Sequence, residues 1–325
     1  MWIFAFVNVL VCADRMCAFK EFHNPSCLRI YEKSLYITEN TTIFIYSFGD
    51  FAFIKKFGRP GEGPREFKNY VKLHFQSGHI FVNSSGKISR FTKDGVFLKE
   101  HRISSGSDFI PIANRYVGAT WTRKDKTSFI TTYIFDKSFN KKKLLNSVEG
   151  TALGAKFLDP ITIWGPLGEE FSVYKDLIFC KIEDGFNIFD KNGDMMFHIG
   201  LTAARVPVTG KDKERYLNFY RTHPRTRLSF AALKQRLKFP RYFPLIRDYR
   251  LAGDRLYIIT FNQKSGKNEI LIYTTAGKFE KKTFLKMCAK NIMEYYPFTF
   301  YNDSIYRLVE NERTEEIELF KKNLY

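Results

Sequence analysis

The sequence has few of the residues, and none of the spacings, that usually mark a metal site or a catalytic nucleophile. Only five of its 325 residues are cysteines and no two form a Cys-x-x-Cys pair, which argues against a structural zinc site and a thioredoxin-type motif. Its six histidines show no His-x-x-x-His spacing, and no Gly-x-Ser-x-Gly elbow is present. We therefore predict no catalytic residue, no metal ligand and no cofactor, and we favour a protein that is not an enzyme.

Acidic residues are also scarce. The chain has 34 Asp and Glu against 52 Lys and Arg, which gives a formal net charge of +18. The excess is concentrated between Arg205 and Arg250, where thirteen basic residues minus three acidic ones leave a local balance of +10. Such a patch suits an anionic partner. A solvated basic face without a dedicated ligand is the alternative interpretation.

Long apolar runs are absent outside the N-terminus, where residues 2–13 form one that ends before Asp14. The run is too short for a comfortable transmembrane span. It suits a secretory leader, and Ala13 supplies a small residue for a peptidase. The alternatives are a lipoprotein leader with a lipidated Cys12, and a mistaken start or a buried edge strand. We predict a signal peptide over residues 1–18, no transmembrane span, and an extracytoplasmic location in the periplasm or cell envelope. In an oxidising compartment Cys17 and Cys27 could form a disulfide.

The sequence does contain a repeated all-β motif. Each copy has two strand-like apolar runs, the second of which ends in Phe or Tyr, and polar turns with Gly or Asn. In the two clearest copies Gly95 and Gly193 occupy matching turn positions, where we expect a left-handed backbone. The copies begin near residues 34, 78, 114, 175, 253 and 302. Because six units of roughly 40–50 residues are typical of a β-propeller, we predict an all-β, six-bladed β-propeller over residues 19–325.

One long insertion interrupts the repeats between the fourth and fifth blades. It covers residues 201–244 and contains two segments rich in helix formers, Lys211–Arg221 and Leu228–Leu237. We predict a basic helical insertion there. We also expect the ring of blades to close through Leu28–Tyr31, as an N-terminal strand added to the final blade.

Arginines are interleaved with aromatic residues in this insertion. The combination suits contacts with phosphate or sulfate together with stacking on a base or sugar ring. The predicted binding residues are Arg221, His223, Arg225, Arg227, Arg236, Arg241 and Tyr242. The alternative is that these side chains pack the insertion onto the sheet through their stems and rings.

A second motif follows the first blade, at residues 57–67. Its glycine spacing is that of a phosphate-binding loop, but Pro64 and Arg65 stand where Lys and Ser or Thr are required, so we expect a tight turn between blades. The phrase resembles one found in the bacterial six-bladed β-propeller family, relatives of the NHL-repeat propellers. The residues that carry the resemblance are Gly58, Gly61, Gly63, Pro64, Glu66 and Phe67. The resemblance implies a propeller that is often exported, and it implies no particular reaction.

Together these observations predict a monomeric, non-catalytic ligand- or protein-binding propeller module of the bacterial envelope. Its expected partner is an anionic glycan, another envelope component or a protein, held on the face that bears the insertion. Two alternatives stay open: a channel-centred metal-dependent enzyme of the lyase or lactonase type, and an RNA-binding NHL-like propeller. We favour the first of the three over nucleic acid because a leader would separate the protein from cellular RNA.

Overall fold

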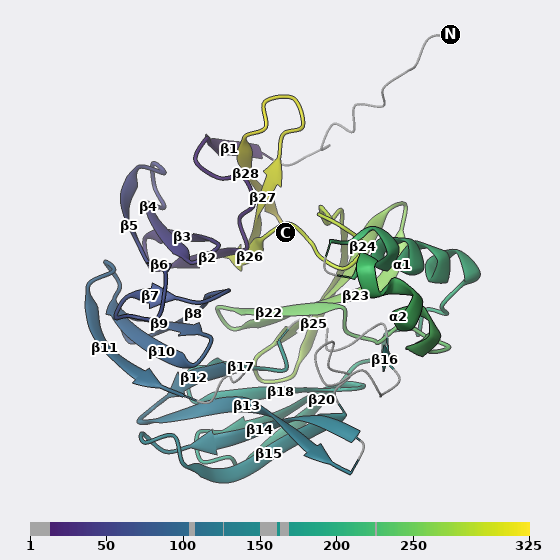
Figure 1. Ribbon diagram of the computed structural model, residues 1–325, viewed down its shortest axis with the longest axis horizontal. Coiled ribbons are helices and arrows are strands. Elements are labelled where there is room, and N and C mark those ends of the chain that lie inside the picture. The colour runs from purple at the N-terminus through teal and green to yellow at the C-terminus, as the bar shows by residue number, and fades with distance from the viewer. Residues whose placement is uncertain (1–13, 104–107, 126, 150–160, 163–168, 225) are drawn as a thin grey trace.

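The computed structural model describes residues 14–103, 108–125, 127–149, 161–162, 169–224 and 226–325. In this part of the chain, six four-stranded antiparallel sheets follow one another around a common centre (Figure 1). Each sheet is one blade, so the fold is a six-bladed β-propeller, as the repeats predict. The first strands of several neighbouring blades contact one another.

The blades are built in chain order, each from its innermost strand outward. Blade 1 contains β2 (Cys27–Tyr31), β3 (Ser34–Glu39), β4 (Thr42–Ser47) and β5 (Phe53–Phe57). Blade 2 contains β8 (Lys72–Gln76), β9 (His79–Ser84), β10 (Lys87–Thr92) and β11 (Phe97–Arg102). Blade 3 contains β12 (Asp108–Ile112), β13 (Arg115–Lys124), β14 (Thr127–Phe135) and β15 (Lys141–Glu149).

The second half of the ring repeats this plan. Blade 4 contains β17 (Phe171–Tyr174), β18 (Leu177–Ile182), β19 (Gly185–Asp190) and β20 (Met195–Gly200). Blade 5 contains β22 (Asp248–Ala252), β23 (Arg255–Lys264), β24 (Lys267–Thr274) and β25 (Phe279–Leu285). Blade 6 contains β26 (Phe298–Tyr301), β27 (Ser304–Glu310), β28 (Ile317–Asn323) and β1 (Asp14–Phe19). Two short parallel ladders join β6 (Arg59–Pro60) to β7 (Glu66–Phe67) and β16 (Ile161–Thr162) to β21 (Leu237–Lys238). The contacts between first strands include those of β2 with β26, β22 with β26, β8 with β12, and β12 with β17.

Strand β1 closes the ring by pairing antiparallel with β28, with Asp14 opposite Lys321 and Phe19 opposite Ile317. The prediction that Leu28–Tyr31 adds to the final blade is therefore wrong, because that segment belongs to β2 in blade 1. Residues 14–18 fall within the predicted signal peptide, where no strand is expected. The closing role was therefore assigned to the next strand-like segment, Leu28–Tyr31. This pairing covers the edge of β28, and β1 becomes the outermost strand of blade 6.

The two cysteines expected to pair lie in different blades. Cys17 is in β1 and Cys27 is in β2, and both are free thiols in the structure. Burial raises the pKa of Cys17 to about 12, so its thiol stays protonated at neutral pH.

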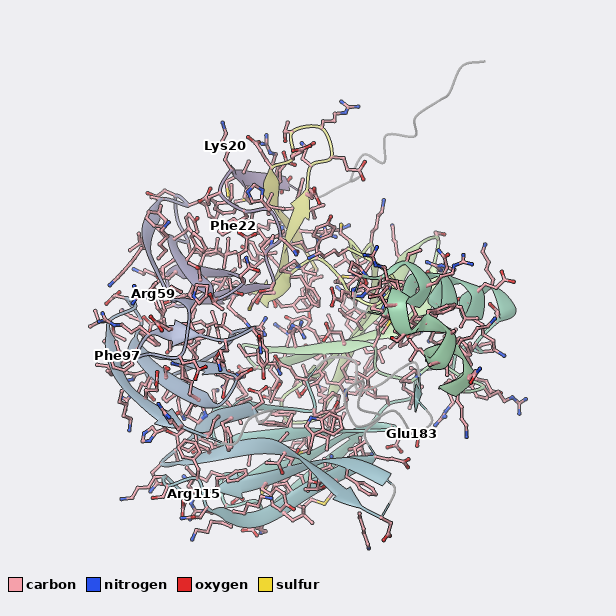
Figure 2. The ribbon with its side chains drawn as sticks, viewed as in Figure 1. Lys20, Phe22, Arg59, Phe97, Arg115 and Glu183 are labelled. Carbon is pink, nitrogen blue, oxygen red and sulfur yellow. The ribbon has the colours of Figure 1, made fainter. Side chains whose placement is uncertain are left out.

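Hydrophobic clusters fill the spaces between neighbouring blades. Between blades 6 and 1, for example, the core contains Phe22, Leu28 and Leu319, all fully buried. Figure 2 shows side chains occupying these spaces, with Phe22 directed into the body of the molecule and Lys20 directed outward. The abundant Phe and Tyr of the sequence thus hold the blades together face to face.

The turn glycines have a second role beyond their backbone conformation. Gly95 and Gly193 have φ of 73° and 82°, the left-handed values that their turns require. A Cβ at Gly95 would lie 2.8 Å from Phe57 of blade 1, and one at Gly193 would lie 2.8 Å from Ile134 of blade 3. Each turn therefore packs against the preceding blade, which any larger residue would push away.

The insertion between blades 4 and 5 is helical, as predicted. It contains α1 (Gly210–Thr222), a 3-10 turn η1 (Arg227–Ser229) and α2 (Phe230–Arg236). A capping box begins α1, with the Asp212 N–H donating to Thr209 Oγ1 and the Thr209 N–H donating to Asp212 Oδ2. Tyr216 and Tyr220, one turn apart, are buried in a cluster that includes Phe261 of β23. The insertion is thereby fixed beside blade 5 (Figure 1).

Candidate functional site

The strands that lead out of one blade and into the next end and begin on the same face of the propeller. Because strands alternate in direction within a four-stranded antiparallel blade, the last strand ends on the side where the first strand begins. The connection from one blade to the next, including the insertion after β20, therefore lies at the channel mouth where the innermost strands start. We call this side of the molecule the insertion-bearing face.

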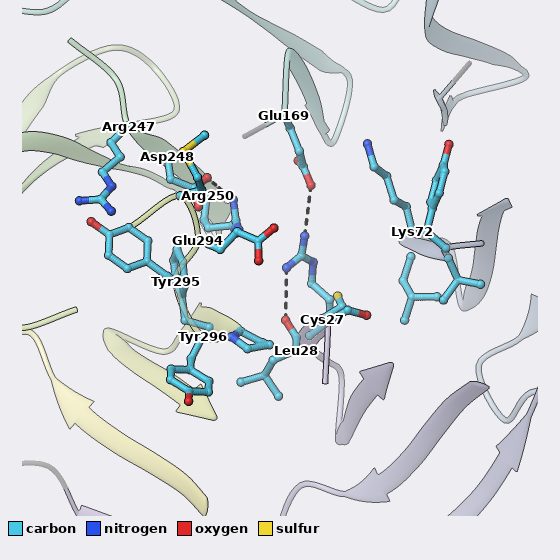
Figure 3. Close-up of a pocket in the computed structure, with 18 residues that line it drawn as sticks. Cys27, Leu28, Lys72, Glu169, Arg247, Asp248, Arg250, Glu294, Tyr295 and Tyr296 are labelled. Atoms are coloured by element: carbon cyan, nitrogen blue, oxygen red, sulfur yellow. Dashed lines mark hydrogen bonds and ion pairs between the residues drawn. The ribbon is translucent and has the colours of Figure 1, made fainter. Parts of the chain in front are cut away.

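A pocket of 430 Å³ occupies the channel mouth on this face (Figure 3). This volume is within the range of small-molecule sites. Its walls come from the beginnings of β2, β8 and β22 and from the segment that leads into β26. The lining includes four cations, three carboxylates and three tyrosines: Arg29, Lys72, Arg247, Arg250, Glu169, Asp248, Glu294, Tyr70, Tyr295 and Tyr296.

An ion pair crosses the mouth of the channel. Arg29 Nη2 of blade 1 lies 3.2 Å from Glu169 Oε1, just before blade 4, and these two blades are opposite one another in a ring of six. Ser172 Oγ donates to the other oxygen of Glu169 at 3.0 Å. Burial alone would raise the pKa of Glu169, but the charges of Arg29, Arg250 and other nearby cations outweigh it and lower that pKa. Glu169 is therefore an ionised carboxylate near the axis.

A second ion pair lines the wall between blades 2 and 3. Lys72 Nζ lies 2.7 Å from Asp108 Oδ2, and His74 Nε2 lies 3.4 Å from Asp108 Oδ1. Burial would raise the pKa of Asp108, but the charge of Lys72 and the hydrogen bond to His74 hold it well below its usual range. Asp108 thus stays charged and engaged with its two basic neighbours.

Blade 5 supplies a third group of charges. Arg250 Nη1 lies 2.5 Å from Asp248 Oδ1, and its guanidinium is 4.7 Å from the centre of the Phe298 ring. Arg247 stacks over the Tyr295 ring at 4.2 Å. Planar cations placed against aromatic rings are rigid, so they can present N–H donors to a ligand with little loss of entropy.

The insertion forms part of the same surroundings. Met293 lines the channel-mouth pocket and also packs against the buried cluster of α1 and α2. Phe243, at the end of the insertion, stacks on Phe261 with ring centres 4.4 Å apart. The basic insertion and the channel mouth are therefore neighbours on one face.

The predicted binding residues are distributed over this insertion. Arg221 is in the last turn of α1, His223 caps that helix, and Arg227 begins η1. Arg241 lies with its guanidinium 5.2 Å from the ring centre of Tyr242, so these two side chains are brought together. Arg225 lies outside the described residues, and of Arg236 only the backbone at the end of α2 is described.

A groove between the two helices contains one of these residues. This pocket of 530 Å³ is lined by Glu214, Arg215, Leu217, Asn218, Arg221, Phe230 and Lys234. Three of the seven are basic and one is acidic, so the groove is cationic. It lacks buried polar side chains, and its basic residues are exposed to solvent. The groove therefore fits a surface contact with a polyanion better than an enclosed small-molecule site.

The motif at residues 57–67 forms a turn beside the mouth. Glu66 Oε2 accepts a hydrogen bond from the Gly63 N–H at 2.9 Å, and Arg59 forms an ion pair with Glu66 Oε1 at 2.9 Å. Phe67 is fully buried in the core between blades 1 and 2. None of the six motif residues lines the channel-mouth pocket.

The channel residues were missed at the level of sequence. Each predicted repeat began at the second strand of its blade, because the innermost strands carry charged residues and so look less like core strands. A signal was present in their alternation: Arg29 lies between apolar neighbours in β2, Lys72 and His74 alternate with them in β8, and Arg250 follows Tyr249 in β22. Charges that alternate with buried residues in the first strand of several repeats mark a polar channel.

No three His, Cys, Asp or Glu side chains in the described ranges come together as potential metal ligands. No helix in the described part of the chain has both the length and the apolar character needed to cross a membrane.

No protein-family model matches the chain, and none of the curated proteins matches it in sequence. Several solved structures are similar in shape. The WD40 domain of Neurospora crassa Pan2 gives a TM-score of 0.43 at 8% identity, over 96% of this chain and 95% of that one. The AfRom2 CNH domain gives 0.39 at 10% identity, over 96% and 99%. A luciferin-regenerating enzyme gives 0.41 at 9% identity, over 93% and 92%. These likenesses are weak, and the assignment as a six-bladed β-propeller rests on the six sheets of the chain itself.

Proposed function

We propose that this propeller is a non-catalytic binding module of the cell envelope, and that it binds an anionic glycan through its insertion-bearing face. The observation that carries the proposal is that the exposed basic residues of the insertion and the pocket at the channel mouth share this face. The envelope location rests on the apolar leader at residues 2–13. Kinship with the bacterial NHL-like propellers, proposed from the Gly58–Phe67 phrase, agrees with that location.

The arrangement of charges favours a long polyanion over a compact one. Exposed Arg221, Arg227 and Arg241 come from three separate segments of the insertion. A chain of acidic sugars can contact such dispersed cations one after another, with each contact individually weak and screened by salt. The channel-mouth pocket lies beside the insertion and can enclose the end of such a chain.

The enzyme alternative is weakened because three carboxylates near the channel mouth are already paired with cations of the protein. Asp108 is engaged by Lys72, Glu169 by Arg29, and Asp248 by Arg250. A divalent ion that bound any of these carboxylates would have to displace a fixed cation and meet its repulsion. RNA would be attracted to the same basic residues as an anionic glycan. Only a direct comparison of the two polymers therefore separates these alternatives.

The test compares binding of polygalacturonate, neutral dextran and poly(U) by isothermal titration calorimetry. We expect polygalacturonate to bind, dextran not to bind, and affinity to fall as the salt concentration rises to about 0.3 M. Combined Arg221→Gln, Arg227→Gln and Arg241→Gln should weaken binding about tenfold or more. Tighter binding of poly(U) than of polygalacturonate would replace the glycan by RNA.

A matched control separates a site from the general positive charge of the protein. Combined Lys55→Gln, Lys56→Gln and Lys99→Gln removes the same three charges from exposed positions on the outer strands β5 and β11. We expect this variant to bind polygalacturonate almost as well as the unaltered protein. Equal weakening of both triple variants would contradict a binding face at the insertion.

A further inference from the structure

The charges at the channel mouth converge on one carboxylate of the protein itself. Arg29, Lys72 and Arg250 come from blades 1, 2 and 5, and Glu169 lies within electrostatic range of all three. Figure 3 shows Lys72, Glu169 and Arg250 approaching the pocket from different sides. The position of Glu169 is therefore one at which cations from three separate blades favour a negative group.

Glu169 is held by two single contacts, one from Ser172 Oγ to its Oε2 at 3.0 Å and one from Arg29 to its Oε1. Arg29 meets it through a single Nη2 contact of 3.2 Å, longer than the 2.7–2.9 Å usual for a charge-assisted hydrogen bond and not bidentate. Its other terminal nitrogen, Nη1, donates to the Leu28 carbonyl at 3.2 Å. Among the described residues, the buried Nε of Arg250 has no hydrogen-bond acceptor. The cluster thus retains donor capacity that Glu169 does not use.

We propose that Arg29, Lys72 and Arg250 form a binding site for the carboxylate of a small polar ligand, and that Glu169 is an internal carboxylate which this ligand displaces. The inference deepens the proposed function and rests on it, because it assigns the part of the glycan that would enter the channel: an acidic sugar at its end. Tyr70, Tyr295 and Tyr296 line the pocket of 430 Å³ and provide aromatic rings for the body of the ligand.

The balance of charge favours a monoanion. The pocket lining has four cations, Arg29, Lys72, Arg247 and Arg250, against three carboxylates, Glu169, Asp248 and Glu294. One ligand carboxylate would therefore equalise the positive and negative charges of the lining. A phosphate dianion would bring a second negative charge beside Glu169, Asp248 and Glu294, so its binding is disfavoured.

The experiment titrates galacturonate, methyl galactoside, acetate and inorganic phosphate into the full chain by isothermal titration calorimetry. We expect galacturonate to bind and methyl galactoside and phosphate not to bind. Glu169→Gln, which removes the internal competitor, should tighten galacturonate binding severalfold. Arg29→Gln should weaken it about tenfold or more. Arg255→Gln is the matched control, because Arg255 makes similar ion pairs with Glu280 and Asp303 outside the pocket and should leave binding unchanged.

Acetate distinguishes the sources of the carboxylate. Binding of acetate as tight as that of galacturonate would support the carboxylate site and assign it to small acids in general, whereas much weaker binding would assign it to an acidic sugar. The proposal is overturned if galacturonate binds neither the unaltered protein nor the Glu169→Gln variant, or if phosphate or methyl galactoside binds equally well. If the Arg29→Gln variant fails to fold, the tighter galacturonate binding expected of Glu169→Gln still tests the proposal.

The outcome also separates this inference from the proposed function. Polygalacturonate binding that depends on the insertion arginines, without galacturonate binding, would leave the binding module intact and remove the channel site. Galacturonate binding without any binding of the polymer would keep the channel site and remove the glycan-binding function.

Discussion

At the scale of single residues, the channel is a set of charges that keep one another ionised. Asp108 is the clearest case, because Lys72 and His74 hold its pKa below the ordinary value in spite of burial. Its charge therefore stabilises the folded state through a difference in proton affinity between folded and unfolded chains. The contribution is moderate, since 46% of the Lys72 side chain is exposed to water.

We predict that Asp108→Asn lowers the free energy of unfolding by about 1–2 kcal/mol at pH 7. The pKa of Asp108 is lower in the folded than in the unfolded chain. The stabilisation is therefore complete above the unfolded pKa of about 4, and it is lost as the pH falls from there through the folded pKa. The difference between the variant and the unaltered protein should therefore shrink between pH 7 and about pH 3. Urea unfolding at the two pH values measures it, and an equal difference at both would contradict the assigned ion pair.

At the scale of elements, the terminal strand β1 closes the ring of blades. It completes blade 6 and buries Phe19, whose ring lies 4.9 Å from Tyr46 of blade 1 and 5.6 Å from Phe22. Without β1 the edge of β28 would be exposed, and the core between blades 6 and 1 would open to water.

We predict that a chain starting at Phe22 melts roughly 5–10 °C lower than one starting at Asp14, and that it associates through the exposed edge of β28. Differential scanning calorimetry and size-exclusion chromatography report the two effects. The chain starting at Asp14 is the control because it retains β1 complete. Equal melting temperatures would show that closure contributes little. The same pair of chains bears on the leader: cleavage after Ala13 preserves β1, whereas cleavage after residue 18 would remove most of it.

At the scale of the whole molecule, the fold was predictable from the sequence and the site was not. Turn glycines such as Gly95 and Gly193 recur because each turn packs on the preceding blade, so they reveal the repeat. The helices of the insertion were also predictable from helix formers and from Pro240 and Pro244 after them. The channel residues were not, because a charge in an innermost strand has meaning only after six such strands are brought around one axis.

The role of the ring follows from this arrangement. Residues that are about 140 positions apart, as Arg29 and Glu169 are, meet only because opposite blades face each other across the channel. The same ring places the insertion beside the mouth through Met293. A ligand on the insertion-bearing face would therefore contact segments from several blades at once.

The most direct test of this account is hydrogen–deuterium exchange of the full chain with and without polygalacturonate. We predict slower exchange in the segments of the insertion-bearing face: residues 205–242, the approach to β26 at residues 286–297, and the start of β8. The outer strands β5 and β11, which also carry exposed lysines, should exchange at unchanged rates. Protection confined to those outer strands, or spread evenly over all six blades, would contradict the claim that this face is where the propeller binds its ligand.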